Sequence, residues 1–200
     1  MENKIIVTTS RRPTPTVRRF VKYLVAVLPS SQYQRRGKLS FSMLALQAID
    51  LNIDKLIVIR NRKGNPGYMD IYQVNHVKKV FAKFCTLFIC GYSINTPYHK
   101  VQPKNKPKNI VILEDVFTSI DDEEIAECLL LGFNIKVLNK LHTPVLGHDN
   151  HYVVLEVVKM FRKVDNYEKP IYEITFKNIE NKIVGPVIRI CKAKVYTKAL

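Results

Sequence analysis

The chain has 200 residues, 46% of them hydrophobic, which is enough to bury a core and excludes a disordered tail. Lys and Arg total 32 against 17 Asp and Glu, and a formal net charge of +15 is typical of proteins that bind a polyanion such as nucleic acid. The four cysteines form no Cys-x-x-Cys pair and no run reaches the ~18 apolar residues of a membrane span, so we expect a soluble protein of a reducing cytoplasm.

The first third of the chain predicts one strand and two helices separated by basic loops. Residues 5–9 form a β-branched run typical of a strand. Thr14 can cap a helix that has Pro15 at its first position, and apolar residues at helical spacing continue to about residue 28. A polar, basic loop is expected over residues 30–38, and Ser40 can cap a second helix that runs through residue 49.

The next segment predicts three strands and then a boundary. Residues 56–59 are typical of a buried strand, and residues 60–67 are expected to form a turn-rich basic loop. Strands follow over residues 68–74 and 80–94. Residues 99–108 are rich in Pro and Lys, so we place there the boundary between a basic N-terminal half (1–100) and a C-terminal half (101–200).

The second half predicts a strand over residues 109–113, a helix from Asp121 to about residue 131, and a short strand over residues 135–138. Acidic residues at the start of a helix are favoured by the helix dipole, and Gly132 is expected to stop this helix. Three β-rich segments follow, over residues 152–161, 171–176 and 183–196. The order strand, helix, strand appears in both halves, which indicates an internal duplication.

The positive charge is concentrated near the N-terminus. Thirteen cationic residues and three acidic ones lie within residues 1–64, a net charge of +10 out of the total of +15. Arg outnumbers Lys there, and a guanidinium suits bidentate contacts with phosphate. We therefore predict that RNA is bound by Thr9, Ser10, Arg11, Arg12, Arg18, Arg19, Lys22, Arg35, Arg36, Lys38, Arg60, Arg62 and Lys63.

Two of the basic loops have a simpler interpretation as well. The junction from Thr8 to Pro13 can hold phosphate, or it can be a solvated loop whose hydroxyls cap backbone groups. The loop around Gly64 is not a nucleotide-binding P-loop, because it lacks the Gly-Lys-Ser/Thr ending, and a tight turn explains its glycines.

Other candidate groups favour a structural interpretation. His148 and His151 have His-x-x-His spacing near His142, but Gly147 and Asn150 indicate a loop rather than a metal site. A carboxylate cluster could hold Mg²⁺, although a helix N-terminus explains most of it, and an acidic patch for a protein partner is an alternative. The cluster comprises Glu114, Asp115, Asp121, Asp122, Glu123 and Glu124. Three aromatics near basic residues are candidates for stacking on bases: Tyr23, Tyr33 and Tyr68.

Three motifs in order resemble the Brix domain family: the run from Ile6 to Pro15, then Arg36-Gly37-Lys38, then the run from Arg62 to Gly67. The likeness is strongest over residues 5–75, and it makes residues 1–200 one Brix domain. It implies an α/β fold in two similar halves, each a mixed sheet with flanking helices like the anticodon-binding domain of class IIa aminoacyl-tRNA synthetases. It also implies binding to ribosomal RNA during subunit assembly, without catalysis, and it supports the basic motif residues Arg11, Arg12, Arg36, Lys38, Arg62 and Lys63.

Three functions are open at this point. We favour a ribosome biogenesis factor that binds ribosomal RNA or its precursor, assists processing and assembly, and contacts other assembly or ribosomal proteins. No cofactor, metal or membrane is expected. A permanent ribosomal protein would show the same charge pattern, and a metal-dependent RNA-processing enzyme would use the acidic cluster.

Overall fold

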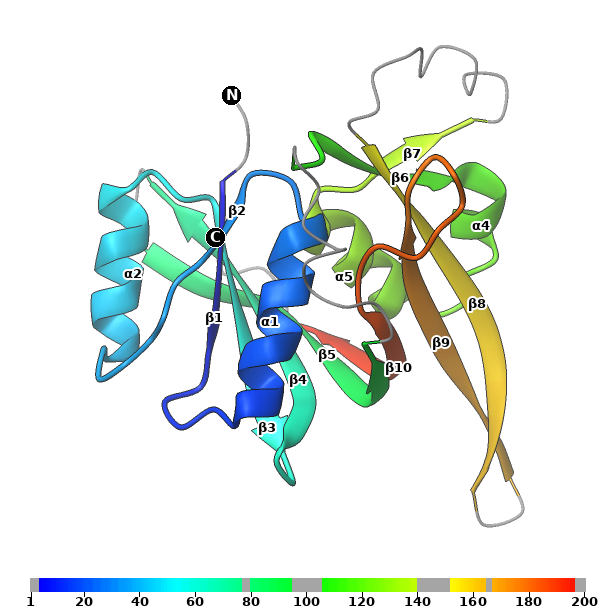
Figure 1. Cartoon of the computed structure of the whole chain (residues 1–200), viewed down its shortest axis with the longest axis horizontal. Coiled ribbons are helices and arrows are strands. Elements are labelled where there is room, and N and C mark those ends of the chain that lie inside the picture. The colour runs from blue at the N-terminus through cyan, green and yellow to red at the C-terminus, as the bar shows by residue number, and fades with distance from the viewer. Residues whose placement is uncertain (1–3, 77–79, 95–105, 140–151, 165–166, 197–200) are drawn as a thin grey trace.

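The computed structural model describes residues 4–76, 80–94, 106–139, 152–164 and 167–196, and the strands in these ranges form one mixed sheet (Figure 1). The N-terminal half contributes β1 (Ile5–Thr9), α1 (Pro15–Val27), β2 (Ser31–Tyr33), α2 (Phe41–Asp50), β3 (Lys55–Arg62), β4 (Asn65–Asn75) and β5 (Val80–Ser93). The C-terminal half contributes β6 (Asn109–Leu113), α4 (Glu114–Thr118), α5 (Glu123–Phe133), β7 (Lys136–Leu138), β8 (Tyr152–Val164), β9 (Tyr167–Lys177) and β10 (Val187–Val195).

The strand order is the same in the two halves. In the first half β1 is parallel to β2 and β3, and β3, β4 and β5 are antiparallel neighbours. In the second half β6 is parallel to β7 and β8, and β8, β9 and β10 are antiparallel neighbours. The halves join where β5 pairs with β10 in antiparallel fashion. The predicted α/β class and the internal duplication are confirmed, whereas the boundary at residue 100 and the likeness to anticodon-binding domains stay predictions.

The main core lies on the sheet face that α1 and α5 cover (Figure 1). Phe20 of α1 and Cys128 of α5 pack in the same hydrophobic cluster as strand residues from both halves, among them Ile71 and Ile174. The α2 helix packs on the opposite face, where Ala48 joins a smaller cluster. This division follows from the β1-α1-β2-α2-β3 order, because right-handed crossovers in opposite directions leave the sheet on opposite faces.

The predicted helices α1, α2 and α5 are confirmed, as are the predicted caps Thr14 and Ser40, whereas α5 begins at Glu123 rather than Asp121 and is capped by Asp122. Thr14, Ser40 and Asp122 each accept a hydrogen bond from the backbone three residues ahead, at 3.3, 3.1 and 3.0 Å. A side-chain oxygen at this position satisfies an amide that the helix itself cannot satisfy. These signals are local, so the sequence alone could place the helix starts.

Several predicted loops and ends were wrong. Residues 31–33 form β2 inside the predicted loop because they pair with β1, and residues 60–67 are mostly strand, with a turn of only two residues. The short α4 was not predicted. The last strand begins at residue 187 rather than 183.

The end of α5 was also misplaced. Gly132 does not stop this helix, which continues to Phe133 and ends where Asn134 adopts a left-handed conformation with φ 54°. Gly132 instead faces β4, where a Cβ atom would lie 2.5 Å from Cδ1 of Ile71. The glycine is therefore required for close helix-to-sheet packing.

Candidate nucleic-acid interface

Three parallel strands bring the predicted basic loops to one edge of the sheet. Because β1, β2 and β3 run in the same direction, the segments that follow them emerge together, at the lower left of Figure 1. These segments are residues 10–14, residues 34–40 and the turn at residues 63–64. In α/β folds, ligands commonly bind at the carboxyl ends of the strands, at the point where the helices on either side of a strand pack on opposite faces of the sheet.

Side-chain hydrogen bonds hold these loops against one another. Thr14 Oγ1 donates to the carbonyl of Gly64 at 2.6 Å, and Ser10 Oγ donates to Asn61 Oδ1 at 2.9 Å. Thr8 Oγ1 donates to the carbonyl of Gln34 at 2.7 Å. The hydroxyls of the first motif thus bind the third motif at Gly64 and the segments just before the second and third motifs, which supports the capping interpretation of that junction.

The third motif has a backbone explanation. Lys63 and Gly64 have φ values of 49° and 83°, as a two-residue hairpin turn between β3 and β4 requires. A Cβ atom on Gly67 would lie 2.2 Å from the Cβ of Arg62, so only glycine fits beside that strand. The turn presents Arg62 and Lys63 to solvent, where both are exposed.

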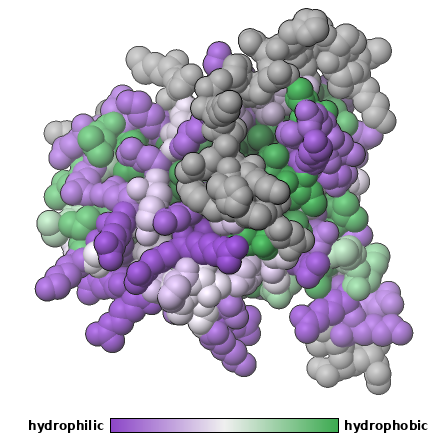
Figure 2. All heavy atoms as spheres, in the orientation of Figure 1, coloured by the Kyte–Doolittle hydropathy of each residue, from purple (hydrophilic) through white to green (hydrophobic). Residues whose placement is uncertain are grey.

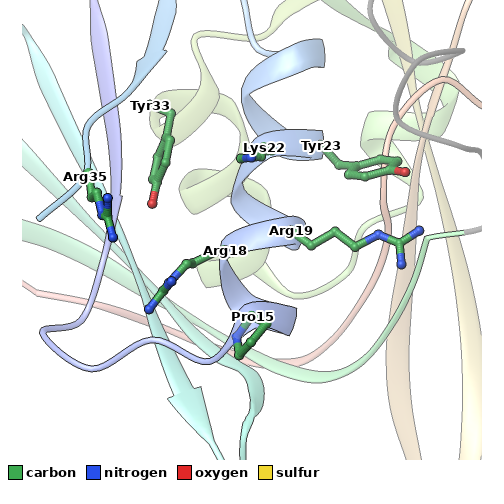
Figure 3. A pocket seen from close by; sticks show the side chains of 7 residues that line it. All are labelled: Pro15, Arg18, Arg19, Lys22, Tyr23, Tyr33 and Arg35. Atoms are coloured by element: carbon green, nitrogen blue, oxygen red, sulfur yellow. The ribbon is translucent and has the colours of Figure 1, made fainter.

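A groove of about 580 Å³ lies between α1 and the segment that follows β2 (Figure 3). Arg18, Arg19 and Lys22 line it from α1, and Tyr33 and Arg35 line it from the other side. The residues that line it include four cations and no carboxylate. The positive charge of this groove suits any polyanion, whether nucleic acid or an acidic protein surface.

The structure places most predicted contact residues at the surface. Figure 2 shows hydrophilic side chains gathered over the lower left of the α1 face. Ser10, Arg36 and Arg60 are partly buried, whereas Thr9 is only 1% exposed, so its side chain is not expected to touch RNA. The exposed members are Arg11, Arg12, Arg18, Arg19, Lys22, Arg35, Lys38, Arg62 and Lys63.

Two of these arginines have shifted pKa values with different causes. Partial burial lowers the pKa of Arg36, and the nearby positive charge of Arg11 lowers it further. Two cations held so close favour an anion between them. Burial also works to lower the pKa of Arg60, but its hydrogen bond to Asp70 outweighs that effect and raises the pKa. Arg60 therefore already has an anionic partner within the sheet.

The predicted aromatic candidates separate into two groups. Tyr23 is 1% exposed, so the prediction that it stacks on bases was wrong. Tyr33 lies in the groove, and the ring of Tyr68 lies 4.4 Å from the guanidinium carbon of Arg60. The sequence reasoning missed Asp70, although a lone carboxylate inside an apolar strand is a signal that could have found it.

The acidic cluster is engaged in the structure. Asp121 accepts hydrogen bonds from Lys159 and Tyr172, Asp122 caps α5, and Glu124 accepts the backbone amide of Val195 at 3.1 Å. Within the described ranges, no group of three or more His, Cys, Asp or Glu residues could hold a metal ion. The histidines at 142, 148 and 151 lie outside the described residues. No helix described here is long and apolar enough to cross a membrane.

Comparison with known proteins decides the family. No family model matches the chain. Over 130 residues it is 44% identical to a probable Brix domain-containing ribosomal biogenesis protein of Aeropyrum pernix, covering 65% of this chain and 71% of that protein. The chain belongs to the Brix domain-containing ribosomal biogenesis proteins.

A second relative and a solved structure extend the match along the chain. The Brix-domain relative from Sulfurisphaera tokodaii is 27% identical over 187 residues, 93% of this chain and 90% of its own length. The crystal structure of a probable ribosomal biogenesis protein from Aeropyrum pernix superposes with a TM-score of 0.70 at 26% identity, covering 95% and 96% of the two chains. The resemblance drawn from the basic motifs is confirmed, and these two matches extend over both halves of the chain.

Proposed function

We propose that the chain is a ribosome biogenesis factor that binds ribosomal RNA or its precursor. The RNA would lie on the basic edge, defined as Arg11, Arg12, Arg36, Lys38, Arg62 and Lys63, and in the adjoining groove. The observation that carries this proposal is the convergence of three basic loops at the carboxyl ends of three parallel strands. The names of the relatives support the same role.

The arrangement suits binding by backbone contacts. Arg18 and Arg35 face the groove from opposite sides, so a phosphate chain between them would be contacted from both. Phosphate contacts of this kind fix the position of an RNA without reading its sequence. The factor would hold RNA segments in place during assembly in the cytoplasm, with residues 1–100 and 101–200 as the two halves of one Brix domain, and no bond-making step is part of the proposal.

The test is binding of the purified protein to ribosomal RNA fragments and to an unrelated structured RNA of equal length, over a salt series. Each phosphate contact contributes ~0.7 to 0.9 to the slope of log affinity against log salt. Arg11→Ala with Arg36→Ala, and separately Arg18→Ala with Arg35→Ala, should each reduce that slope by about one to two contacts.

The matched control is Lys136→Ala with Lys169→Ala, which removes two exposed cations from the second half. This pair should leave the slope nearly unchanged. If the control and the edge variants weaken binding equally, or if no ribosomal RNA fragment binds better than the unrelated RNA, the basic edge is not the site.

A test in cells separates a factor from a permanent ribosomal protein. Depletion of a factor should lead to accumulation of precursor ribosomal RNA, while the protein itself is absent from mature subunits. Stoichiometric presence of the chain in mature subunits, measured by quantitative mass spectrometry, would contradict the proposal.

A further inference from the structure

Among the described residues, no helix packs on the sheet face opposite α1 and α5 over β5, β10 and the part of β4 around Tyr68. Side chains alternate along a strand, and Met69 and Ile71 point into the main core, so Tyr68 and Asp70 lie on the opposite face. The α2 helix covers this face over β1, β3 and part of β4, where Phe41 packs on Tyr72 at a ring distance of 4.7 Å. Beyond that contact, the described residues of the face are polar, cationic and aromatic.

The strand register places a cation, two aromatic rings and a second cation in one row across the sheet. Arg60 of β3 pairs with Tyr68 of β4, Tyr68 pairs with Phe88 of β5, and Phe88 pairs with Lys192 of β10. The Arg60 guanidinium carbon lies 4.4 Å from the Tyr68 ring centre, and the Tyr68 and Phe88 rings lie 5.6 Å apart, edge to face. The two rings are half-buried and Lys192 is exposed, so the row is accessible from solvent.

A buried carboxylate organises the adjoining row. Asp70 accepts hydrogen bonds from Arg60, from Lys83 at 2.7 Å and from Thr86 at 2.7 Å. Its charge is thereby neutralised, and Arg60 is held over the Tyr68 ring. Just after β10, the hydroxyl of Tyr196 lies 3.3 Å from the hydroxyl of Thr86. The ammonium groups of Lys83 and Lys194 lie 4.8 and 5.3 Å from the centre of the Tyr196 ring.

We propose that this stacking face, defined as Arg60, Tyr68, Phe88, Lys192, Lys194 and Tyr196, binds the unpaired bases of single-stranded RNA. Every base has a flat face that stacks on aromatic rings and guanidinium planes, and flanking cations contact the phosphates on either side. The excess of cations around the rings favours RNA over an apolar protein segment. The inference rests on the proposed function, since it assumes that RNA reaches the neighbouring basic edge.

The stacking face is continuous with that edge. Arg60 is two residues before Arg62 on β3, the strand that leads into the hairpin turn of the basic edge. An RNA strand whose phosphates contact the loops can therefore continue onto the sheet. Duplex segments would be held at the edge and unpaired segments on the stacking face.

The test compares a fluorescently labelled 12-nucleotide single-stranded RNA with a blunt duplex of the same length, using fluorescence anisotropy at one salt concentration. Phe88→Leu and Tyr196→Leu remove a ring but keep an apolar side chain. Each should weaken binding of the single strand by about tenfold and leave the duplex unchanged. Phe88→Tyr keeps a ring and should bind the single strand as the wild type does.

The matched control is Phe161→Leu, since Phe161 is an exposed aromatic on β8 with Lys159 5.3 Å from its ring centre. It lies outside the stacking face and should not affect either RNA. If Phe88→Leu and Tyr196→Leu bind the single strand like the wild type, while Arg11→Ala with Arg36→Ala loses both RNAs, the stacking face is refuted and the proposed function stands. If the wild type binds neither RNA, both fail.

Discussion

Asp70 is a buried carboxylate, 2% exposed, in the middle of the apolar strand β4. Burial raises the pKa of a carboxyl group, but the hydrogen bonds from Arg60, Lys83 and Thr86 outweigh burial and lower the pKa of Asp70. The residue therefore has two roles: it stabilises the junction of β3, β4 and β5, and it orients two cations of the open sheet face.

The lowered pKa of Asp70 predicts that the free energy of unfolding decreases at low pH. Because the folded-state pKa lies below the unfolded value of about 3.9, the contribution of Asp70 is complete above that value and is lost as the pH falls through the folded-state pKa. Asp70→Asn should lower the free energy of unfolding at pH 7 by about 1 to 3 kcal/mol, and by much less at pH 2. Urea denaturation between pH 7 and pH 2 measures both values.

A surface ion pair supplies the control for that experiment. Glu180 and Lys182 are 2.7 Å apart, both are exposed, and the pKa of Glu180 is also lowered by its lysine. Such pairs are screened by water, so Glu180→Gln should leave stability unchanged at every pH. Equal acid sensitivity of wild type and Asp70→Asn would show that Asp70 does not carry the effect.

At the scale of elements, the approach of α5 to β4 depends on one glycine. Gly132 lies against the end of the Ile71 side chain, which is fully buried. Lys55 of β3 donates hydrogen bonds to the carbonyl of Leu131 and to Asn134 at the end of the same helix, and burial lowers the pKa of Lys55 to about 8. The C-terminal turn of α5 is therefore held by strands of the other half.

This packing predicts a coupled pair of substitutions. Gly132→Ala should destabilise the protein by about 1 to 2 kcal/mol, because overpacking outweighs the gain in helix propensity. Ile71→Val removes the Cδ1 atom that the new Cβ would meet, so Gly132→Ala should be far less destabilising in that background. A double-mutant cycle of urea unfolding free energies measures the coupling, and additive effects would contradict the packing argument.

At the scale of the whole molecule, one hydrophobic cluster includes α1, α5 and strands from both halves. The antiparallel pairing of β5 with β10 makes the sheet continuous across the junction. In the described part of the chain, the large cluster on that face is shared by both halves, so each half is stabilised by the other.

A shared core predicts one cooperative unfolding transition. The chain has ten tyrosines and no tryptophan, so tyrosine fluorescence and far-UV circular dichroism should report the same urea midpoint. Ile110→Ala truncates a buried side chain in the second half. It should lower the free energy of unfolding by about 2 to 5 kcal/mol and shift both signals to the same lower midpoint. Two separate midpoints would mean that the halves fold independently.

The sequence alone determined the features that depend on neighbours along the chain. The starts of α1 and α2 were predicted because Thr14 and Ser40 cap helices whose apolar faces repeat at a fixed spacing, and the start of α5 was predicted to within two residues from its acidic run. The family and the basic motif residues were predicted because the motifs are contiguous runs of residues, whereas their convergence at one edge depends on the pairing of β1 with β2 and β3. Each of these signals involves only a few neighbouring residues, so it can be recognised without the tertiary structure.

The tertiary structure decided what depends on pairing between distant segments. β2 exists because it pairs with β1, Tyr23 and Thr9 are buried by the way the elements pack, and Gly132 is explained by a contact with Ile71. The row from Arg60 to Lys192 spans four strands, and its last pairing, between β5 and β10, joins the two halves of the chain. The hairpin turn at residues 63–64 fixes the register of β3 and β4, whereas the register of β5 against β10 depends on pairing between distant segments.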